Sequence, residues 1–384
     1  MRKKAVLFIL VFMNIFLLSG CWNYVEIDQT ISVAGFAVDV GQRGYKYHLS
    51  AETISVGKRK DGEIEAEVIE TDGNTVFECV RKLMELASKK LYFGHCKTII
   101  IGEELAVRGI TEVIDLPIRN HEMRSEIDLM IAKDSTGRDF MMTEGLTTPI
   151  ASYKLYNLTR TFPISVGEAL THKMYKIYNN VHTDGVSTII PALEIRMAEE
   201  QRLLKLAGGA VFCGDRLTGY IDNVQVKYLS IITNKLKTGL ITIEDKDNTE
   251  SFMSFEIYRT SAKTRLSFGD DGPKVNISVN MSVIVGEIES EFDFSKSEEI
   301  EKTRHLLEDE IQKKCTAVIE QAQKDYGCDL LGICVIMQRD YPEKWELYKA
   351  EWSSSFEKIP ISVESTIRIT GSGVNNRSTR KRSE

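Results

Sequence analysis

The stretch TIIIGEELAVRGITEVIDLPIRNHEMRSEIDLMIA, residues 98–132, decides the fold. It opens with a short β-branched run, Thr98 to Ile101, which is typical of a buried strand. The segment EELAVRGITEVIDLPI that follows reads as a helix broken near Pro117, and residues 126–132, EIDLMIA, alternate apolar and polar side chains like a strand. Strand, helix and strand at this length predict a βαβ unit, which favours parallel pairing of the two strands.

The residues before this unit predict two strands, a loop and a helix. Residues 31–40 and 45–56 read as strands joined by a turn at 41–44. The charged segment KRKDGEIEAEVIE, residues 58–70, predicts a surface loop. Thr75 and Glu78 have the spacing of a capping box, and an apolar stripe follows at helical spacing over about 76–88. We therefore expect a helix there that packs one face on a sheet.

The C-terminal half predicts a hairpin, long strands and one long helix. Residues 210–221 read as a hairpin that turns at Gly214, and residues 254–268 and 275–288 read as two long strands. Ser295 and Glu298 form a second capping-box pattern, from which an amphipathic helix should run to Tyr326. A clean apolar–polar alternation over 359–371 predicts the last strand.

Taken together, these elements predict an α+β protein of three consecutive domains, each a β-sheet with helices packed on it. The long amphipathic helix belongs to the last domain. We expect an N-terminal α/β-type domain over 21–200, a small middle domain over 201–250, a C-terminal sheet-plus-long-helix domain over 251–371, and a basic flexible tail over 372–384.

The first residues predict a lipoprotein signal peptide, 1–20. A basic cluster is followed by an apolar run of about 14 residues, whereas a spanning helix needs roughly 20. The run ends in Leu-Ser-Gly-Cys, residues 18–21, which has the form of a bacterial lipobox. An ordinary signal anchor with an incidental cysteine is the alternative, but position, spacing and flanks all favour lipidation. Cys21 is therefore expected to be the first mature residue and to carry the S-diacylglycerol and N-acyl (palmitate) anchor, because two lipid chains give stable attachment.

Charge and cysteine usage limit the function further. The chain has a formal charge of −7, and losing Arg2, Lys3 and Lys4 with the signal peptide makes it −10. A net acidic surface argues against nucleic-acid binding, which needs basic patches. Six other cysteines are spread along the chain without a CxxC pair. Cys328 and Cys334 could form a disulfide, but buried free thiols are the favoured state.

A search for chemical motifs predicts no catalytic residue, no metal site and no cofactor. The six histidines show no HxH or HExxH spacing, and GxSxG, GxxxxGK[ST] and GxGxxG do not occur. Three short patterns, at 55–58, 237–239 and 278–280, match those of penicillin-binding proteins but stand in a different order. We therefore expect a non-enzymatic protein.

Several segments resemble the Ger(x)C family. The resemblance begins at GCWNYVEID, residues 20–28, and at a strand ending in Asp39, and it continues through residues 75–110. Asn23 departs from the family, which more often has Asp there. The resemblance returns at GGAVFCGDRLTGYI (208–221), at Asp329 in CDLLG (328–332) and at YPEKWELYKAEW (341–352), and it ends at Gly371.

This resemblance implies the lipoprotein C subunit of a nutrient germinant receptor in spore-forming bacteria. It implies three α+β domains on a lipid anchor, held on the outer face of the spore inner membrane. It also implies multi-spanning A/B-type partner subunits and no catalytic residues. We expect the protein to act in spore germination by scaffolding or assembling the receptor, with direct germinant binding left open. The alternative is a solute-binding lipoprotein that captures a small nutrient between two similar α/β lobes.

Overall fold

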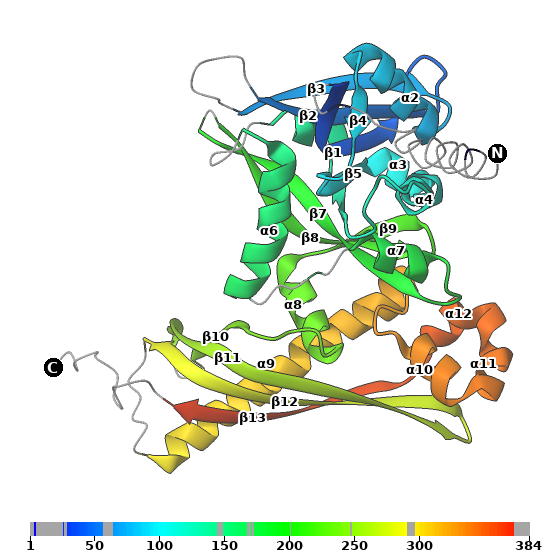
Figure 1. The fold of residues 1–384 in the computed structure, drawn as a ribbon. Coiled ribbons are helices and arrows are strands. Elements are labelled where there is room, and N and C mark those ends of the chain that lie inside the picture. The colour runs from blue at the N-terminus through cyan, green and yellow to red at the C-terminus, as the bar shows by residue number, and fades with distance from the viewer. Residues whose placement is uncertain are drawn as a thin grey trace.

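The structure of the chain is a computed structural model. Apart from the single residues Lys4 and Glu26, it describes residues 29–56, 64–143, 149–166, 170, 173–199, 201–245, 248–289 and 296–371. Strands in these ranges form two sheets, one of nine strands and one of four, which lie one above the other in Figure 1. The α+β class is thereby confirmed.

The first sheet is built around the predicted βαβ unit. β1 (Thr30–Val40) pairs antiparallel with β2 (Tyr47–Val56) on one side and parallel with β5 (Thr98–Gly102) on the other. β5 in turn pairs parallel with β6 (Asp128–Ala132), which confirms the prediction. The remaining strands of this sheet are β3 (Ile64–Gly73), β4 (Lys90–Tyr92), β7 (Ser187–Ala198), β8 (Gln201–Cys213) and β9 (Arg216–Ile221).

Helices cover both faces of this sheet, as parallel strands require. Neighbouring residues of a strand point to opposite faces, so Ile99 and Ile101 join one core while Ile100 joins another. The first face carries α2 (Val76–Ala87), α3 (Glu103–Arg108), α4 (Thr111–Arg119) and α7 (Met174–Val181); the second carries α5 (Gly137–Met141) and α6 (Ala151–Val166).

Helix α2 begins where its sequence predicts. The Thr75 hydroxyl accepts a hydrogen bond from the Glu78 amide at 3.0 Å, and the Glu78 carboxylate accepts one from the Asn74 amide at 2.9 Å. Val80 and Leu83 are buried on its inner face. The expected helix over about 76–88 is confirmed.

Two predictions for the first sheet are wrong. Residues 64–70, expected in a surface loop, lie in the edge strand β3, because a strand with one open edge and an exposed face can hold many glutamates. The break expected near Pro117 lies instead at Gly109, between α3 and α4. Gly109 has φ +134°, which a helix cannot contain, whereas Pro117 lies inside the short α4.

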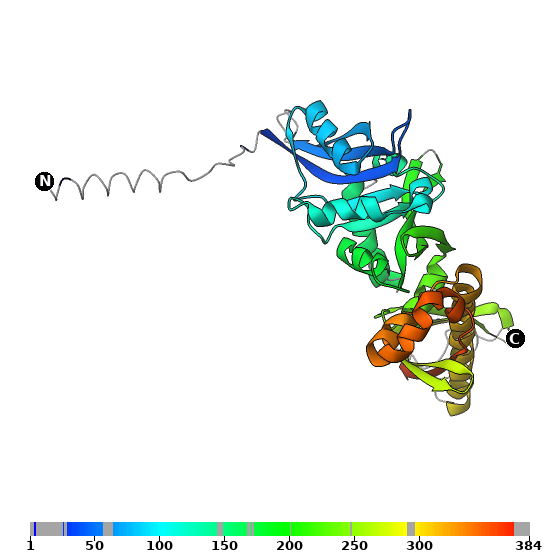
Figure 2. The same cartoon turned by 90° about the vertical axis from the view of Figure 1, so that its right-hand side faces the viewer.

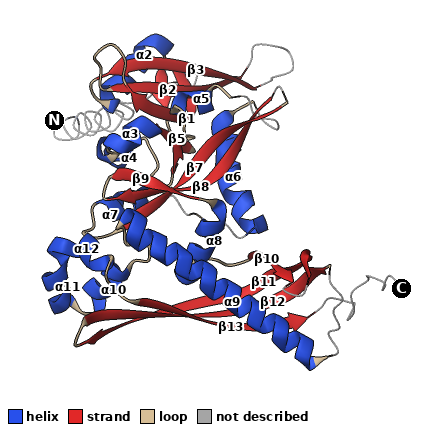
Figure 3. Ribbon diagram, turned by 180° about the vertical axis from the view of Figure 1, so that it is seen from behind, coloured by secondary structure: helices blue, strands red, loops and turns tan. Residues whose placement is uncertain are grey.

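The second sheet has the order β10-β11-β12-β13, and the last two strands are parallel. Helix α9 lies diagonally across one face of it (Figure 3) and continues into a π-helical turn, η2. Leu307, Ile311 and Cys315 of α9 are fully buried, so the predicted long helix is confirmed. The bounds are β10 (Gly239–Asp245), β11 (Asn248–Gly269), β12 (Gly272–Ile288), β13 (Ile361–Gly371), α8 (Asn223–Ile232), α9 (Ser297–Gln321), η2 (Ala322–Tyr326), α10 (Ile333–Asp340), α11 (Pro342–Tyr348), η3 (Lys349–Glu351) and α12 (Trp352–Phe356).

Helix α9 also contacts the outer edge of β13. The Ile367 amide donates to the Glu308 carboxylate at 2.9 Å, and the Ser365 hydroxyl donates to the Glu308 carbonyl at 2.8 Å. Arg304, one turn earlier, holds that carboxylate with two bonds of 2.8 Å. The Ser295 cap expected for this helix lies outside the described residues; Lys296 occupies the N-cap position without a side-chain cap bond.

The division into three domains stays a prediction, but strand pairing crosses its first boundary. β7, before residue 200, pairs antiparallel with β8 along eleven residue pairs. β8 and β9 thus extend the first sheet, whereas β10 opens the second. Among the described residues, no helix is both long and apolar enough to cross a bilayer.

Candidate functional site

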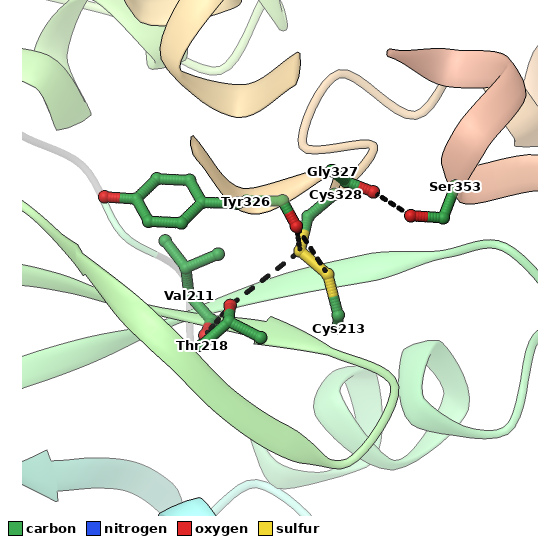
Figure 4. Close-up of a disulfide and its surroundings, with 7 residues drawn as sticks. All are labelled: Val211, Cys213, Thr218, Tyr326, Gly327, Cys328 and Ser353. Carbon is green, nitrogen blue, oxygen red and sulfur yellow. Dashed lines mark hydrogen bonds between the residues drawn. A yellow bond between two sulfur atoms is a disulfide. The ribbon is translucent and has the colours of Figure 1, made fainter. Parts of the chain in front are cut away.

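We call the nine-stranded sheet with helices α2–α7 the first unit, the four-stranded sheet with α8–α12 the second unit, and the contact between them the junction. The C-terminal segments of the family resemblance meet in space at this junction. Figure 4 shows their centre, a disulfide between Cys213 at the end of β8 and Cys328 just after η2. Their Cα atoms are 5.7 Å apart. Gly327 ends η2 in the left-handed conformation, at φ +61°, and thereby turns the chain toward the β8–β9 hairpin.

The favoured prediction of free thiols is therefore wrong for Cys328, and so is the alternative pairing with Cys334. The true partner, Cys213, lies 115 residues earlier in the chain. Cys334 is a buried free thiol, as are Cys79, Cys96 and Cys315. Tertiary structure brings Cys213 and Cys328 together, so sequence spacing could not reveal the pair.

Hydrogen bonds surround the disulfide and tie the hairpin to the helices. The Tyr326 hydroxyl donates to the Tyr220 carbonyl of β9 at 2.7 Å. The Thr218 hydroxyl lies 3.8 Å from the Cys328 sulfur and donates to the Val211 carbonyl at 3.0 Å (Figure 4). On the opposite side, Ser353 of α12 donates to the Gly327 carbonyl at 2.6 Å (Figure 4). The disulfide and these hydrogen bonds together hold the β8–β9 hairpin against the segment that follows η2.

A tryptophan pair forms the second part of this junction. Trp345 and Trp352 are buried and meet edge to face, with ring centroids 5.3 Å apart. They pack over Gly185, in the turn between α7 and β7, where an added Cβ would lie 2.8 Å from Trp345 and 2.9 Å from Trp352. Gln338 of α10 donates to the Asp184 carbonyl of the same turn at 2.8 Å. The motif YPEKWELYKAEW therefore serves to dock α10–α12 on the first sheet's unit.

Two aspartates of the resemblance act as buried acceptors at helix starts. Asp329, 2 % exposed, accepts hydrogen bonds from the amides of Leu331 (3.2 Å), Ile333 (3.1 Å) and Cys334 (2.7 Å) where α10 begins. The orphan amides of a helix N-terminus need such an acceptor. Burial raises the pKa of the Asp329 carboxyl, and the bonds from the amides oppose that rise.

Asp39, at the end of β1, does the same for α5. Its two oxygens accept from the amides of Gly137 (2.7 Å) and Arg138 (2.9 Å), and burial raises the pKa of its carboxyl. An added Cβ on Gly102 would meet the Asp39 carboxylate at 2.0 Å, which explains that glycine. An acid inside the apolar run FAVDV was the available sequence signal for this role.

Glu52 is a third acceptor of this kind, and sequence reasoning missed it. It accepts from the amides of Ala151 (2.7 Å) and Ser152 (2.8 Å) at the start of α6, and its pKa is raised by burial. In the sequence, Glu52 looks like the other polar residues of strand β2. No local pattern distinguished it from an exposed glutamate.

The described residues offer little reactive chemistry. Burial raises the pKa of Cys79 to about 11 and those of Cys96 and Cys315 to about 12, so these thiols stay protonated and inert near neutral pH. Within the described part of the chain, no cluster of three His, Cys, Asp or Glu residues could hold a metal ion. Ser55 lies in β2 of the first sheet while Ser278 lies in β12 of the second, so these two penicillin-binding-protein motifs fall on different sheets. Cys21, the predicted lipidation site, lies outside the described residues.

Comparison with known proteins gives consistent results over most of the chain. Residues 23–195 match the family model described as "Spore germination protein N-terminal domain", and residues 207–373 match "Spore germination B3/ GerAC like, C-terminal". The chain is similar to spore germination protein B3 of Bacillus subtilis (strain 168), 23% identical over 97% of this chain and 99% of that protein. It is likewise similar to spore germination protein KC of the same organism, at 22% identity over 98% of each. A crystal structure of the GerBC protein shares the fold, with a TM-score of 0.60, 18% identity, and coverage of 89% of this chain and 97% of that one.

Proposed function

Because the chain belongs to the GerAC-like family of spore germination proteins, we propose that it is the lipid-anchored C subunit of a nutrient germinant receptor. In this proposal it sits on the outer face of the spore inner membrane through lipids on Cys21, and it scaffolds or assembles multi-spanning A/B-type subunits. The observation that carries the proposal is that both family models match in order and together span most of the chain.

The position of Cys21 supports a short tether. Thr30, the first residue of β1, lies nine positions after Cys21, and an extended chain covers at most about 3.6 Å per position. The start of β1 would therefore lie within about 32 Å of the anchored cysteine. Confinement to such a layer raises the effective concentration of the subunit near membrane partners, so modest interfaces suffice for assembly.

The junction supports a scaffolding role rather than a hinge. A disulfide, the packing of two tryptophans on Gly185 and hydrogen bonds from Tyr326 and Gln338 connect the first sheet's unit to the helices of the second unit. Such a connection suits a body that holds partners at fixed positions. Disulfides persist in oxidising compartments, which agrees with an exported protein.

The alternative is a solute-binding lipoprotein that captures a small nutrient. It would have two similar lobes around a cleft, whereas the sheets here differ in strand number and pairing. A thermal shift assay with amino acids and sugars separates the two ideas. A binder is stabilised by RT ln(1 + [L]/Kd), and a scaffold that contacts no nutrient keeps its melting temperature.

The direct test is a mild-detergent pull-down of the full-length protein, tagged at its C-terminus, from dormant spore membranes. We expect a multi-spanning protein to be recovered with it, and to be lost with Cys21→Ala. A matched control keeps Cys21→Ala but replaces the signal peptide by a spanning helix. Recovery should return if tethering is what Cys21 supplies. Recovery of the lipoprotein alone from wild-type membranes would refute the proposal.

A further inference from the structure

A polar cavity lies beside the junction, between α7 and β7 of the first unit and the end of α8. Its volume is about 400 Å³, enough for a small metabolite. α7 contributes Lys176, Asn179 and Asn180, and the turn after α8 contributes Thr233 and Lys235. The cavity is thus shared by the two parts of the molecule that the Cys213–Cys328 disulfide joins. Figure 1 shows α7 and α8 close to the place where the two sheets meet.

The cavity carries positive charge without a compensating acid. Two lysines line it, and no carboxylate is found among the described residues of its wall. Lys176 and Lys235 make no ion pair with the rest of the described chain, although Lys176 lies 6.0 Å from the Tyr175 ring. Lys176 and Lys235 are exposed as whole residues, so a solute can reach them, while the ammonium group of Lys235 is partly shielded from water by the cavity wall.

The turn that presents Lys235 is fixed by hydrogen bonds. The Lys235 amide donates to the Ser230 carbonyl at 2.8 Å, and the Thr233 hydroxyl donates to the Leu229 carbonyl at 2.7 Å. Asn234 takes the left-handed conformation, φ +57°, and its side chain accepts from the Ala262 amide of β11 at 3.0 Å. The backbone of Lys235 is therefore fixed before any ligand arrives, which lowers the entropy cost of binding.

The surroundings favour a negative ligand. Loss of water around its ammonium group lowers the pKa of Lys235, and the nearby charge of Lys176 lowers it further. An anion between the two lysines would remove this repulsion. Thr188, in the same wall, is 5 % exposed, and its hydroxyl has no hydrogen-bond partner within the described chain.

From the shared cavity, its two unpaired lysines and its amide and hydroxyl groups, we infer a binding site for a small anion with one carboxylate or phosphate group. The lysines neutralise its charge, and Asn179, Asn180 and Thr188 can donate hydrogen bonds to it. Because α7 belongs to the first unit and Lys235 follows α8, a bound anion would contact both sides of the junction. This site goes beyond the scaffolding role and does not depend on it.

The test is isothermal titration calorimetry of the full-length protein in detergent with sodium acetate and, separately, inorganic phosphate, at constant ionic strength. We expect saturable binding of one of them, which also identifies the anion class. Lys235→Met and Lys176→Met should each weaken binding by about tenfold or more, since each removes a charge-assisted hydrogen bond. Lys237→Met is the matched control, because this exposed lysine lies two residues away and outside the cavity wall. Saturation by neither anion, or an equal loss with Lys237→Met, would overturn the inference.

A labelling experiment on the unaltered chain covers the case in which a variant does not fold. Acetic anhydride modifies exposed lysine amines, and mass spectrometry reports the rate at each residue. Phosphate should slow the labelling of Lys235 and Lys176 and leave that of Lys237 unchanged. Equal rates with and without phosphate at all three lysines would exclude phosphate from this cavity.

Discussion

Cys213 and Cys328 are 115 residues apart in the sequence, yet their disulfide joins the last residue of β8 to the chain just after η2. Every residue of the second sheet and of α9 lies between them in the sequence, apart from β13. The bond therefore closes a loop that contains most of the second unit. The disulfide should stabilise the protein mainly by restricting the unfolded chain, because the two cysteines cannot move apart when the protein unfolds.

Replacing both cysteines by serine tests this effect. The chain-entropy relation gives about 5 kcal/mol for a loop of 115 residues, and native disulfides typically contribute about 2–5 kcal/mol. We expect the free energy of unfolding in urea to fall within that range in the double variant Cys213→Ser/Cys328→Ser. The wild type measured in reducing agent is the control and should show the same loss. A loss below 1 kcal/mol, on the order of a single hydrogen bond, would mean that the bond constrains little.

The pairing itself can be read by peptide mapping. Iodoacetamide at pH 8 should leave Cys79, Cys96 and Cys315 unmodified in the native protein, because burial keeps these thiols protonated. In denaturant without reductant they should react, while Cys213 and Cys328 should appear as one cross-linked peptide. A cross-link between Cys328 and Cys334 would contradict the structure.

Gly185 gives a test of the tryptophan contact. It has φ +76°, and an added Cβ would clash with both Trp345 and Trp352. Gly214 is a matched control, because it has φ +63° but nothing within 4 Å of an added Cβ. We expect Gly214→Ala to cost about 1–2 kcal/mol of stability from the backbone alone. Gly185→Ala should cost about 1–3 kcal/mol more, from overpacking. If both variants lost the same free energy of unfolding in urea, the tryptophan side chains would be able to move aside for the added methyl group without an energetic cost.

The buried acceptor Asp329 should be sensitive to the type of substitution. Asp329→Ala leaves three amides at the start of α10 without an acceptor, each worth about 1–3 kcal/mol when buried. Asp329→Asn keeps one carbonyl oxygen and should lose less. Thermal unfolding measures both variants. The same loss for Asn and Ala would mean that charge, rather than hydrogen bonding, is what α10 requires.

The raised pKa values of Asp39, Glu52 and Asp329 also predict a pH effect. Between the unfolded pKa, about 4 for such groups, and the higher folded pKa, the folded state binds more protons. Stability from these groups is therefore complete below the unfolded pKa and is lost as pH rises through the folded pKa. In that pH window, the free energy of unfolding of the wild type should fall relative to that of Asp39→Asn as the pH rises. A difference that stays constant from pH 4 to 7 would contradict a raised pKa.

Much of the fold could be predicted where local signals are strong. The Thr75 cap, the β-branched run at Thr98 and the alternation of β13 each identify their element from a few neighbouring residues. β3 was missed because its glutamates look like a loop, and they are tolerated only because the strand lies at a sheet edge. The helix break at Gly109 could be predicted only from its φ angle, whereas Pro117 was the stronger helix-breaking signal in the sequence.

The candidate site was predictable only in part. Asp39 and Asp329 stood out within family segments, although their role as acceptors for helix amides needed the tertiary structure. The pairing of Cys213 with Cys328 and the packing of Gly185 under two tryptophans join segments more than a hundred residues apart. Contacts between such distant segments produce no periodic pattern of residues that a single sequence could reveal.

The bond between Ile367 and Glu308 has a consequence for how copies of the protein behave when crowded. β13 is the outermost strand of the second sheet, and an open strand edge can pair with the same edge of another molecule and begin aggregation. Here an amide of that edge is already bonded to α9, and Arg304 holds the Glu308 carboxylate in place. The helix thus opposes strand addition at this point of the sheet's border. Many copies could then share a small area of membrane without forming intermolecular sheets at that border.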